Sequence, residues 1–256
     1  RRVLFRSKLV PIDPLEVTLS LRWDSWRSYK GAAVQTNYSN VANPVITSAA
    51  GGPVADKSKT ALNPTLSARY DLSDRMALRG SAYKAFRAPG MNNMYRTFGS
   101  ANITVANPSL GPETLVGSEI GADWHGTGYS VGATLFTAKV KDVVANYTLN
   151  PGGVFFSGFI PQAVQNICGA SVGVGAALCT GTVSYNTNGQ DQRSNGLEID
   201  TRWTLQRDLD LSAYYTRTLT YYTSTTTGDP VNKQLQLVPK DVLGASLLWQ
   251  IGRAHV

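Results

Sequence analysis

The sequence predicts an all-β protein, an antiparallel transmembrane β-barrel of which this chain holds an incomplete part of about eight strands. Apolar and polar side chains alternate with a period of two in several segments, whereas helical periodicity is weak. Short turns alternate with long connections, which is typical of outer-membrane barrels. No segment approaches the roughly 18 consecutive apolar residues that a transmembrane helix requires.

The expected strands each carry one apolar face and one polar or small face. The first covers residues 15–23, and its apolar face consists of Leu15, Val17, Leu19, Leu21 and Trp23. The same alternation predicts further strands, in order, within residues 62–70, 76–83, 119–124, 129–135, 197–203, 211–216 and 243–249.

The connections between these strands are of two kinds. Tight turns are expected at residues 71–74, 125–128 and 206–209. Long connections are expected at residues 27–60, 87–112, 145–193 and 222–238. A soluble domain seldom carries several loops longer than about 15 residues, so the pattern favours a barrel with its long loops at one end.

Aromatic side chains end the strands that run toward the short turns. These residues are Tyr70, Trp124, Trp203 and Trp249, while Trp23 and Trp26 stand at the opposite end of the first strand. Such rings prefer the interface between hydrocarbon and water, so they predict an aromatic girdle. The alternative is a soluble β-sandwich, in which these rings would be buried between two layers.

Both ends of the chain look foreign. Residues 1–7 and 251–256 can be back-translated into complementary DNA strings that resemble a short-read sequencing adapter, so we expect non-native scars there. They contain four arginines and no acidic residue. Without them the net charge falls from +7 to +3, which leaves 20 basic and 17 acidic side chains. The charge therefore does not indicate a nucleic-acid partner.

Two short motifs occur in order along the chain. The first is Phe86, Arg87, Ala88 and Pro89, and the second is Asn107, Pro108, Ser109 and Leu110. Further along are residues 194–198 (SNGLE) and 238–240 (VPK). This series resembles the barrel of TonB-dependent outer-membrane receptors, with their FRAP box and Asn-Pro-Asn-Leu box. Ser109 replaces the second asparagine of the latter.

The resemblance implies that residues 8–250 form part of a barrel of about 22 strands whose plug domain is absent from this chain. It implies a cell outer-membrane receptor that captures a scarce small-molecule ligand, most commonly a ferric siderophore, and imports it with energy relayed through TonB. The partners would be outer-membrane lipid, the plug and the TonB complex. We expect no enzyme activity, no cofactor and no nucleic acid. The alternative is a passive porin or a surface-adhesion barrel.

Candidate ligand-binding residues lie at the expected loop end of the barrel. They are Arg87, Tyr95, Arg96, Phe98, Phe155, Phe156 and Tyr222, whose cationic and aromatic groups could contact an anionic or aromatic ligand. Arg87 and Pro89 could instead only end a strand, since proline lacks a ladder donor. No histidine lies between the two motifs, which disfavours haem ligation there.

The two cysteines, Cys168 and Cys179, lie in the longest expected loop. We expect a disulfide, which would contribute about 3 kcal/mol by restraining the loop. A metal or redox pair would need a nearby histidine or closer spacing, so no metal site is expected. His125 lies in a short turn, away from any cleft, which argues against a hydrolase. Charged residues on the expected inner face should pair with each other or with the plug, and these are Arg22, Arg69, Arg79, Glu119, Asp123, Glu198, Asp200 and Arg202.

Overall fold

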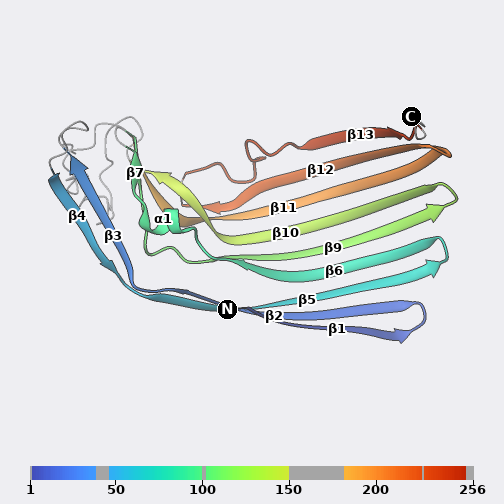
Figure 1. Ribbon diagram of the computed structural model, residues 1–256, viewed down its shortest axis with the longest axis horizontal. Helices are drawn as coiled ribbons and strands as arrows, with labels where there is room; N and C mark the ends of the chain where they lie inside the picture. The colour runs from blue at the N-terminus through green and yellow to red at the C-terminus, as the bar shows by residue number, and fades with distance from the viewer. Residues whose placement is uncertain (1, 39–45, 100–101, 150–181, 227, 252–256) are drawn as a thin grey trace, which may run out of the picture.

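The computed structural model describes residues 2–38, 46–99, 102–149, 182–226 and 228–251. It contains an eleven-stranded sheet in which nine strands follow one another in antiparallel order (Figure 1). In spatial order these are β1 (Arg2–Ile12), β2 (Leu15–Ser28), β5 (Lys57–Ser73), β6 (Met76–Arg87), β9 (Glu113–Gly126), β10 (Tyr129–Thr148), β11 (Val183–Gln206), β12 (Leu209–Thr225) and β13 (Asp241–Trp249).

The remaining elements belong to the long connections. A separate hairpin of β3 (Gly31–Tyr38) and β4 (Ile46–Val54) lies between β2 and β5. The connection from β6 to β9 contains α1 (Met91–Tyr95), β7 (Phe98–Gly99) and β8 (Ile103–Val105). No helix among the described residues is long and apolar enough to cross a membrane.

All eight expected strands are present and in the expected order, which confirms the predicted fold class. The continuous antiparallel path has one strand more than expected, β1, whose first part falls in residues 1–7, and the short strands β7 and β8 join the sheet beside this path. β1 pairs with β2 from Arg2 opposite Asp24 to Ile12 opposite Leu15. Whether residues 1–7 and 251–256 are foreign to the natural protein stays a prediction.

Most strands extend beyond their predicted ends at the side of the long connections. β11 begins at Val183 rather than near residue 197, and β10 continues to Thr148. The start of β11 is polar on both faces, and the end of β10 has the two apolar residues Val143 and Val144 side by side in the chain, so neither segment carries the period-two signal that marks a half-buried strand. They project beyond the part of the sheet with an apolar face, toward the side that carries α1 and the β3–β4 hairpin (Figure 1).

One face of the sheet is apolar and exposed, as a surface in contact with lipid requires. Leu66, Ile120 and Leu135 on this face are 48%, 64% and 57% exposed. Trp124 and Trp203, at the short-turn end of the same face, both contact the ring of Tyr129, at centroid distances of 5.5 and 5.8 Å. These tryptophans are exposed rather than buried between two layers, so the sandwich alternative is wrong.

The opposite, inner face is polar, and at three places on it an aromatic ring lies flat against the sheet. Here an aromatic ring lies directly over a glycine of the neighbouring strand, where no space for a Cβ atom remains. The pairs are Tyr83 with Gly117, Phe136 with Gly196, and Tyr214 with Gly244. The sheet is open, because β1 and β13 form its two edges within the described residues.

Lipid contact of the apolar face can be tested with an arginine at mid-depth. Leu135→Arg in the full-length protein should lower the free energy of unfolding from lipid vesicles by about 2–4 kcal/mol, because the charge would enter hydrocarbon. Denaturant unfolding followed by tryptophan fluorescence measures the loss. Thr216→Arg, on the inner face at similar depth, is the control and should cost much less. Equal losses for both variants would contradict the assignment of the faces.

Candidate functional site

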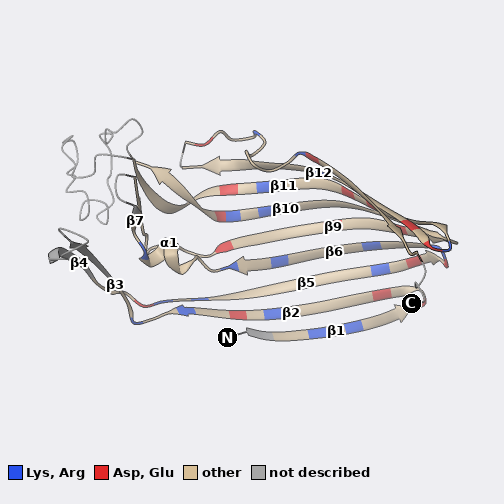
Figure 2. Cartoon of the chain, turned by 45° about the horizontal axis from the view of Figure 1, so that its top comes forward, with Lys and Arg blue, Asp and Glu red and all other residues tan. Residues whose placement is uncertain are grey.

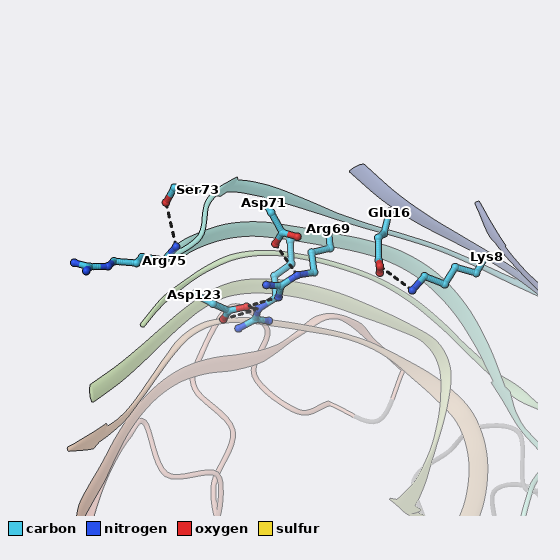
Figure 3. Close-up of polar contacts among 8 residues, drawn as sticks. Lys8, Glu16, Arg69, Asp71, Ser73, Arg75 and Asp123 are labelled. Carbon is cyan, nitrogen blue, oxygen red and sulfur yellow. Dashed lines mark hydrogen bonds and ion pairs between the residues drawn. The ribbon is translucent and has the colours of Figure 1, made fainter. Parts of the chain in front are cut away.

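The inner face carries a network of ion pairs on β5, β6 and β9. The Arg79 Nε atom lies 3.0 Å from Asp123 Oδ1, and the Arg69 Nη1 atom lies 3.5 Å from Asp123 Oδ2. Arg69 also contacts Asp71 at 2.9 Å, and Glu16 of β2 pairs with Lys8 of β1 at 2.7 Å (Figure 3). Three of these residues, Glu16, Arg69 and Arg79, line a hollow of about 300 Å³ on the inner wall.

The expectation that inner charges pair with each other is therefore confirmed for several residues. Arg22 contacts Asp24 at 2.7 Å, and the Tyr83 hydroxyl donates to Glu119 at 2.8 Å. By contrast, the expected inner charges of β11 form no ion pair within the described part of the chain, and these are Glu198, Asp200 and Arg202. Several inner-face charges on β2, β5, β6 and β9 are thus paired with neighbouring side chains, whereas the three on β11 form no ion pair among the described residues.

The β6–β9 connection crosses the loop end of the sheet. Near its start, the Tyr95 hydroxyl at the end of α1 hydrogen-bonds to Ser28 Oγ at the end of β2. Near its end, β8 pairs in parallel with the start of β11, with Ile103 opposite Val183. The connection therefore links β2 to β11, across the ends of the strands between them (Figure 1).

The packed core of the described structure lies under this connection rather than in the sheet. The four largest fully buried side chains are Met94 in α1, Val105 in β8, Leu110 beside the second motif and Val183 in β11. Burial of four such side chains stabilises the connection by roughly 1.5–3 kcal/mol each as an upper estimate. The connection is thus a packed part of the fold.

Arg87 of the first motif joins the two ends of the β6–β9 connection. Arg87 ends β6 opposite Glu113, the first residue of β9. The Arg87 Nη2 atom lies 2.6 Å from Glu113 Oε2, and the Val144 N–H donates to Glu113 Oε1 at 2.9 Å. The hydrogen bond to Glu113 raises the pKa of Arg87 and outweighs the opposing effect of burial. Glu113 is buried, whereas the Arg87 side chain is 73% exposed.

The second motif is fastened to β11 by amide side chains. The Asn107 side chain donates to the Asn186 carbonyl at 2.8 Å and accepts from the Ser109 N–H at 2.8 Å. The Asn188 side chain accepts from the Gly111 N–H at 2.7 Å and donates to its carbonyl at 3.0 Å. The Asn107 side chain and the backbone of Gly111 are therefore hydrogen-bonded to β11.

The remaining sequence-predicted site residues have different environments. Arg96 and Phe98 are exposed, and Phe98 is 49% exposed. Tyr222 is half-buried on β12, and burial, followed by the charge of Asp229, raises its pKa. The structure brings Arg87, Tyr95, Arg96 and Phe98 into one connection but places Tyr222 on another element. Four predicted residues lie outside the described residues, namely Phe155, Phe156, Cys168 and Cys179.

Sequence reasoning missed the partners that hold the two motifs. Glu113 could have been found, because an acid opens the strand that follows the connection closed by Arg87. Asn186 and Asn188 gave no signal, since they lie in a segment that is polar on both faces. Among the described residues, no three His, Cys, Asp or Glu side chains are grouped to hold a metal ion.

A curved antiparallel sheet that is apolar outside, polar inside and girdled by aromatic rings defines the wall of an outer-membrane-type β-barrel. The family profile described as "TonB dependent receptor-like, beta-barrel" matches residues 7–254. The chain therefore belongs to this family. Its members are outer-membrane transporters of Gram-negative bacteria and are not enzymes, which places this protein in the outer membrane.

Solved structures support the same fold. The copper transporter OprC is 16% identical, with a TM-score of 0.64, and the match covers 98% of this chain and 33% of that one. For the ferric-catecholate import receptor Fiu from E. coli K12 the identity is 17%, the TM-score 0.62, and the coverage 98% and 32%. For the FrpB iron transporter (F3-3 variant) from Neisseria meningitidis these values are 15%, 0.59, 98% and 30%.

This chain thus spans about a third of the length of the structures it matches. A search of curated protein sequences gives no significant match.

The role of Arg87 can be separated from ligand contact by a double-mutant cycle. Arg87→Gln should lower the free energy of unfolding by about 1–3 kcal/mol, because the buried Glu113 carboxylate loses its charged partner. In the Glu113→Gln background the same change should cost clearly less. Thermal unfolding of the four full-length proteins measures the coupling. Equal costs in both backgrounds would show that the pair is not the structural contact described here.

The hydrogen bonds that hold the second motif to β11 should protect its backbone amides from hydrogen exchange. Asn107→Ala leaves the Asn186 carbonyl and the Ser109 N–H without their partner, which should cost about 1–3 kcal/mol locally. Amide hydrogen exchange across residues 105–111 should therefore accelerate by roughly 5- to 100-fold. Asn92→Ala, at an exposed position of α1, is the matched control and should leave these rates unchanged. Unaltered protection in Asn107→Ala would contradict the fastening.

Proposed function

We propose that this chain supplies part of the capture surface of a receptor that binds a scarce ligand at the cell surface and imports it with TonB-relayed energy. Membership of the TonB-dependent receptor family supports this proposal. Solved structures of the same fold include a copper transporter, an iron transporter and a ferric-catecholate import receptor. The ligand we propose is a ferric siderophore, and the proposed partners are a plug domain inside the barrel and the TonB complex.

The observation that carries the proposal is the arrangement of the β6–β9 connection. The connection is held to β2 and β9 by side-chain contacts and to β11 by strand pairing and a hydrogen bond, so its exposed side chains extend from a fixed backbone. A fixed frame favours binding, because little conformational entropy is lost when a ligand docks. Arg96 and Phe98 project from this frame and combine a cation with an aromatic ring.

Among the predicted ligand residues, Arg96 and Phe98 are the strongest candidates. The Arg87 guanidinium contacts Glu113, and the Tyr95 hydroxyl contacts Ser28. Arg96 has no carboxylate partner within the described ranges of the chain. A guanidinium and a ring in one loop suit an anionic ligand with aromatic groups, which is the chemistry of a catecholate-type iron chelate. We retain Phe155, Phe156 and Tyr222 as further proposed contacts, and a Cys168–Cys179 disulfide as a proposed restraint of their loop.

Binding and uptake by the full-length receptor test this proposal. Arg96→Gln should weaken binding of an iron-loaded catecholate siderophore about tenfold or more, because a charge-assisted hydrogen bond is lost. Phe98→Ala should weaken it by a smaller factor. Fluorescence quenching measures binding, and radioactive iron accumulation by whole cells measures uptake.

Two controls keep the outcomes distinct. Arg75→Gln changes an exposed arginine in the short turn at the opposite end of the barrel and should leave binding unaltered. Deletion of the TonB protein should abolish accumulation but preserve surface binding. Uptake that persists without TonB would favour the passive-porin alternative. Normal binding by both Arg96→Gln and Phe98→Ala would contradict the proposed capture site.

A further inference from the structure

The strands β5 and β6 separate before either of them ends. Their ladder stops at Thr65 opposite Tyr83, whereas both strands continue beyond this pair toward the loop end. Within the described part of the chain, residues 57–64 pair with β2 alone, and residues 84–87 pair with β9 alone. Figure 1 and Figure 2 show the two strands diverging toward the side of α1. A gap therefore opens inside the described wall, between two neighbouring strands rather than at an edge of the sheet.

The gap begins near the upper boundary of the hydrocarbon. Pro64 stands beside the last pair of the ladder, and a proline suits a position where pairing ends, because it has no N–H to donate. Met76 pairs with Trp124 and marks the girdle in β6, and Tyr83 lies seven residues beyond it. A tilted strand rises by about 2.6 Å per residue along the membrane normal, so the ladder ends about 18 Å above the girdle. The apolar band of such barrels is about 25 Å tall, so water of the headgroup layer can reach the unpaired backbone groups.

Two hollows meet at this gap. On the outer face, an apolar groove of about 570 Å³ is lined by Leu21, Val116 and Lys84 among others. In the gap itself, a hollow of about 400 Å³ is lined by residues 59–62 of β5 and by Lys84 and Phe86 of β6. Consecutive residues of a strand point to opposite faces, so residues 59–62 border this hollow with the edge of β5 rather than with one face. Because Lys84 lines both hollows, the groove continues into the gap.

The gap also adjoins a third hollow, on the inner face. This hollow of about 290 Å³ is lined by Ala85, Leu115 and Val140 among others. Ala85 pairs with Leu115, and Leu115 pairs with Val140, so the three side chains form one apolar row on the inner wall. Phe86 lines both this hollow and the one in the gap. A series of hollows therefore leads from the lipid-facing side, between β5 and β6, to the interior of the barrel.

The gap carries more positive than negative charge. Lys59 pairs with Trp26 and lies on the inner face, whereas Lys84 pairs with Val116 and lies on the outer face. Neither lysine forms an ion pair within the described ranges of the chain. Asp142 also lines the hollow in the gap, so two lysines and one aspartate leave a positive charge in excess. Positive charge beside an apolar groove suits a ligand that combines an anionic head with an apolar chain.

We propose that this gap is a lateral passage for an amphiphilic ligand, namely an anionic iron chelate that carries an acyl chain. The anionic head contacts Lys59 on the inner face, and the chain lies in the gap and in the outer groove. An acyl chain draws such a ligand into the outer leaflet, because each buried methylene group favours the membrane. The side opening therefore admits the ligand from the membrane, in addition to entry through the loops. This route rests on the proposed function, since import of an anionic chelate is assumed, and it adds the class of ligand and its point of entry.

Joining the two strands across the gap tests this route. If the ladder continued beyond Thr65 and Tyr83, Leu62 would lie opposite Phe86, so Leu62→Cys/Phe86→Cys places two thiols across the opening. Oxidation or a short bis-maleimide reagent joins them in the full-length receptor on whole cells, and mass spectrometry of its peptides verifies the link. The probes are an iron-loaded tris-catecholate chelator with a dodecyl chain and the same chelator without the chain.

Joining the thiols should lower uptake of the chain-bearing chelate about tenfold or more, because lost burial of as few as two methylene groups has that effect on binding. Uptake of the chain-free chelate should not change, which also shows that the linked barrel is folded. Ser67→Cys/Ser81→Cys is the matched control, because these residues already pair in the ladder, and linking them should leave uptake of both chelates unaltered.

The remaining outcomes separate the passage from the proposed function. Unchanged uptake of the chain-bearing chelate after linking Leu62→Cys to Phe86→Cys would overturn the lateral passage. Equal loss of both chelates would also overturn it, because the gap would then not select for the chain. Failure of the unmodified receptor to import either chelate would instead contradict the proposed ligand class, and the passage with it.

Discussion

The structure depends on one constraint, namely that a backbone in hydrocarbon must satisfy each N–H and C=O group within the protein. Antiparallel pairing of neighbouring strands from β1 to β13 meets that requirement between the two edges of the described sheet. Pairing in turn sends alternate side chains to opposite faces, so the outer face becomes apolar and the inner face polar. The ion pairs of Arg69, Arg79 and Asp123 are possible on the inner side because hydrocarbon does not reach them.

This constraint explains how much could be predicted from the sequence. Strand order, the direction of each face and the positions of Trp124 and Trp203 follow from local alternation. The strand extensions and the interior of the β6–β9 connection do not, because water rather than lipid surrounds them and no periodic signal is imposed. The contacts of Arg87 with Glu113 and of Asn107 with Asn186 join residues 26 and 79 positions apart, which alternation cannot reveal. The identity of a ligand is still less accessible, since it depends on a few exposed side chains.

The two sequence motifs acquire a physical meaning from the contacts around them. Arg87 and Asn107 each satisfy a buried partner, and Met94, Val105 and Leu110 fill the space beneath the connection. The two motifs therefore hold the connection in place, while the side chains of Arg96 and Phe98, which lie exposed between them, form none of those contacts. In the proposed function, recognition and stability thus belong to different side chains of a single connection.

The rings that lie over glycines on the inner face have a mechanical consequence. A tyrosine or phenylalanine ring directed toward the barrel axis would pack into the surface of any domain inside the barrel. Tyr83, Phe136 and Tyr214 instead lie against the backbone of Gly117, Gly196 and Gly244. At these three pairs of residues the rings therefore project less far from the inner face than upright rings would, because each lies over a glycine of the neighbouring strand.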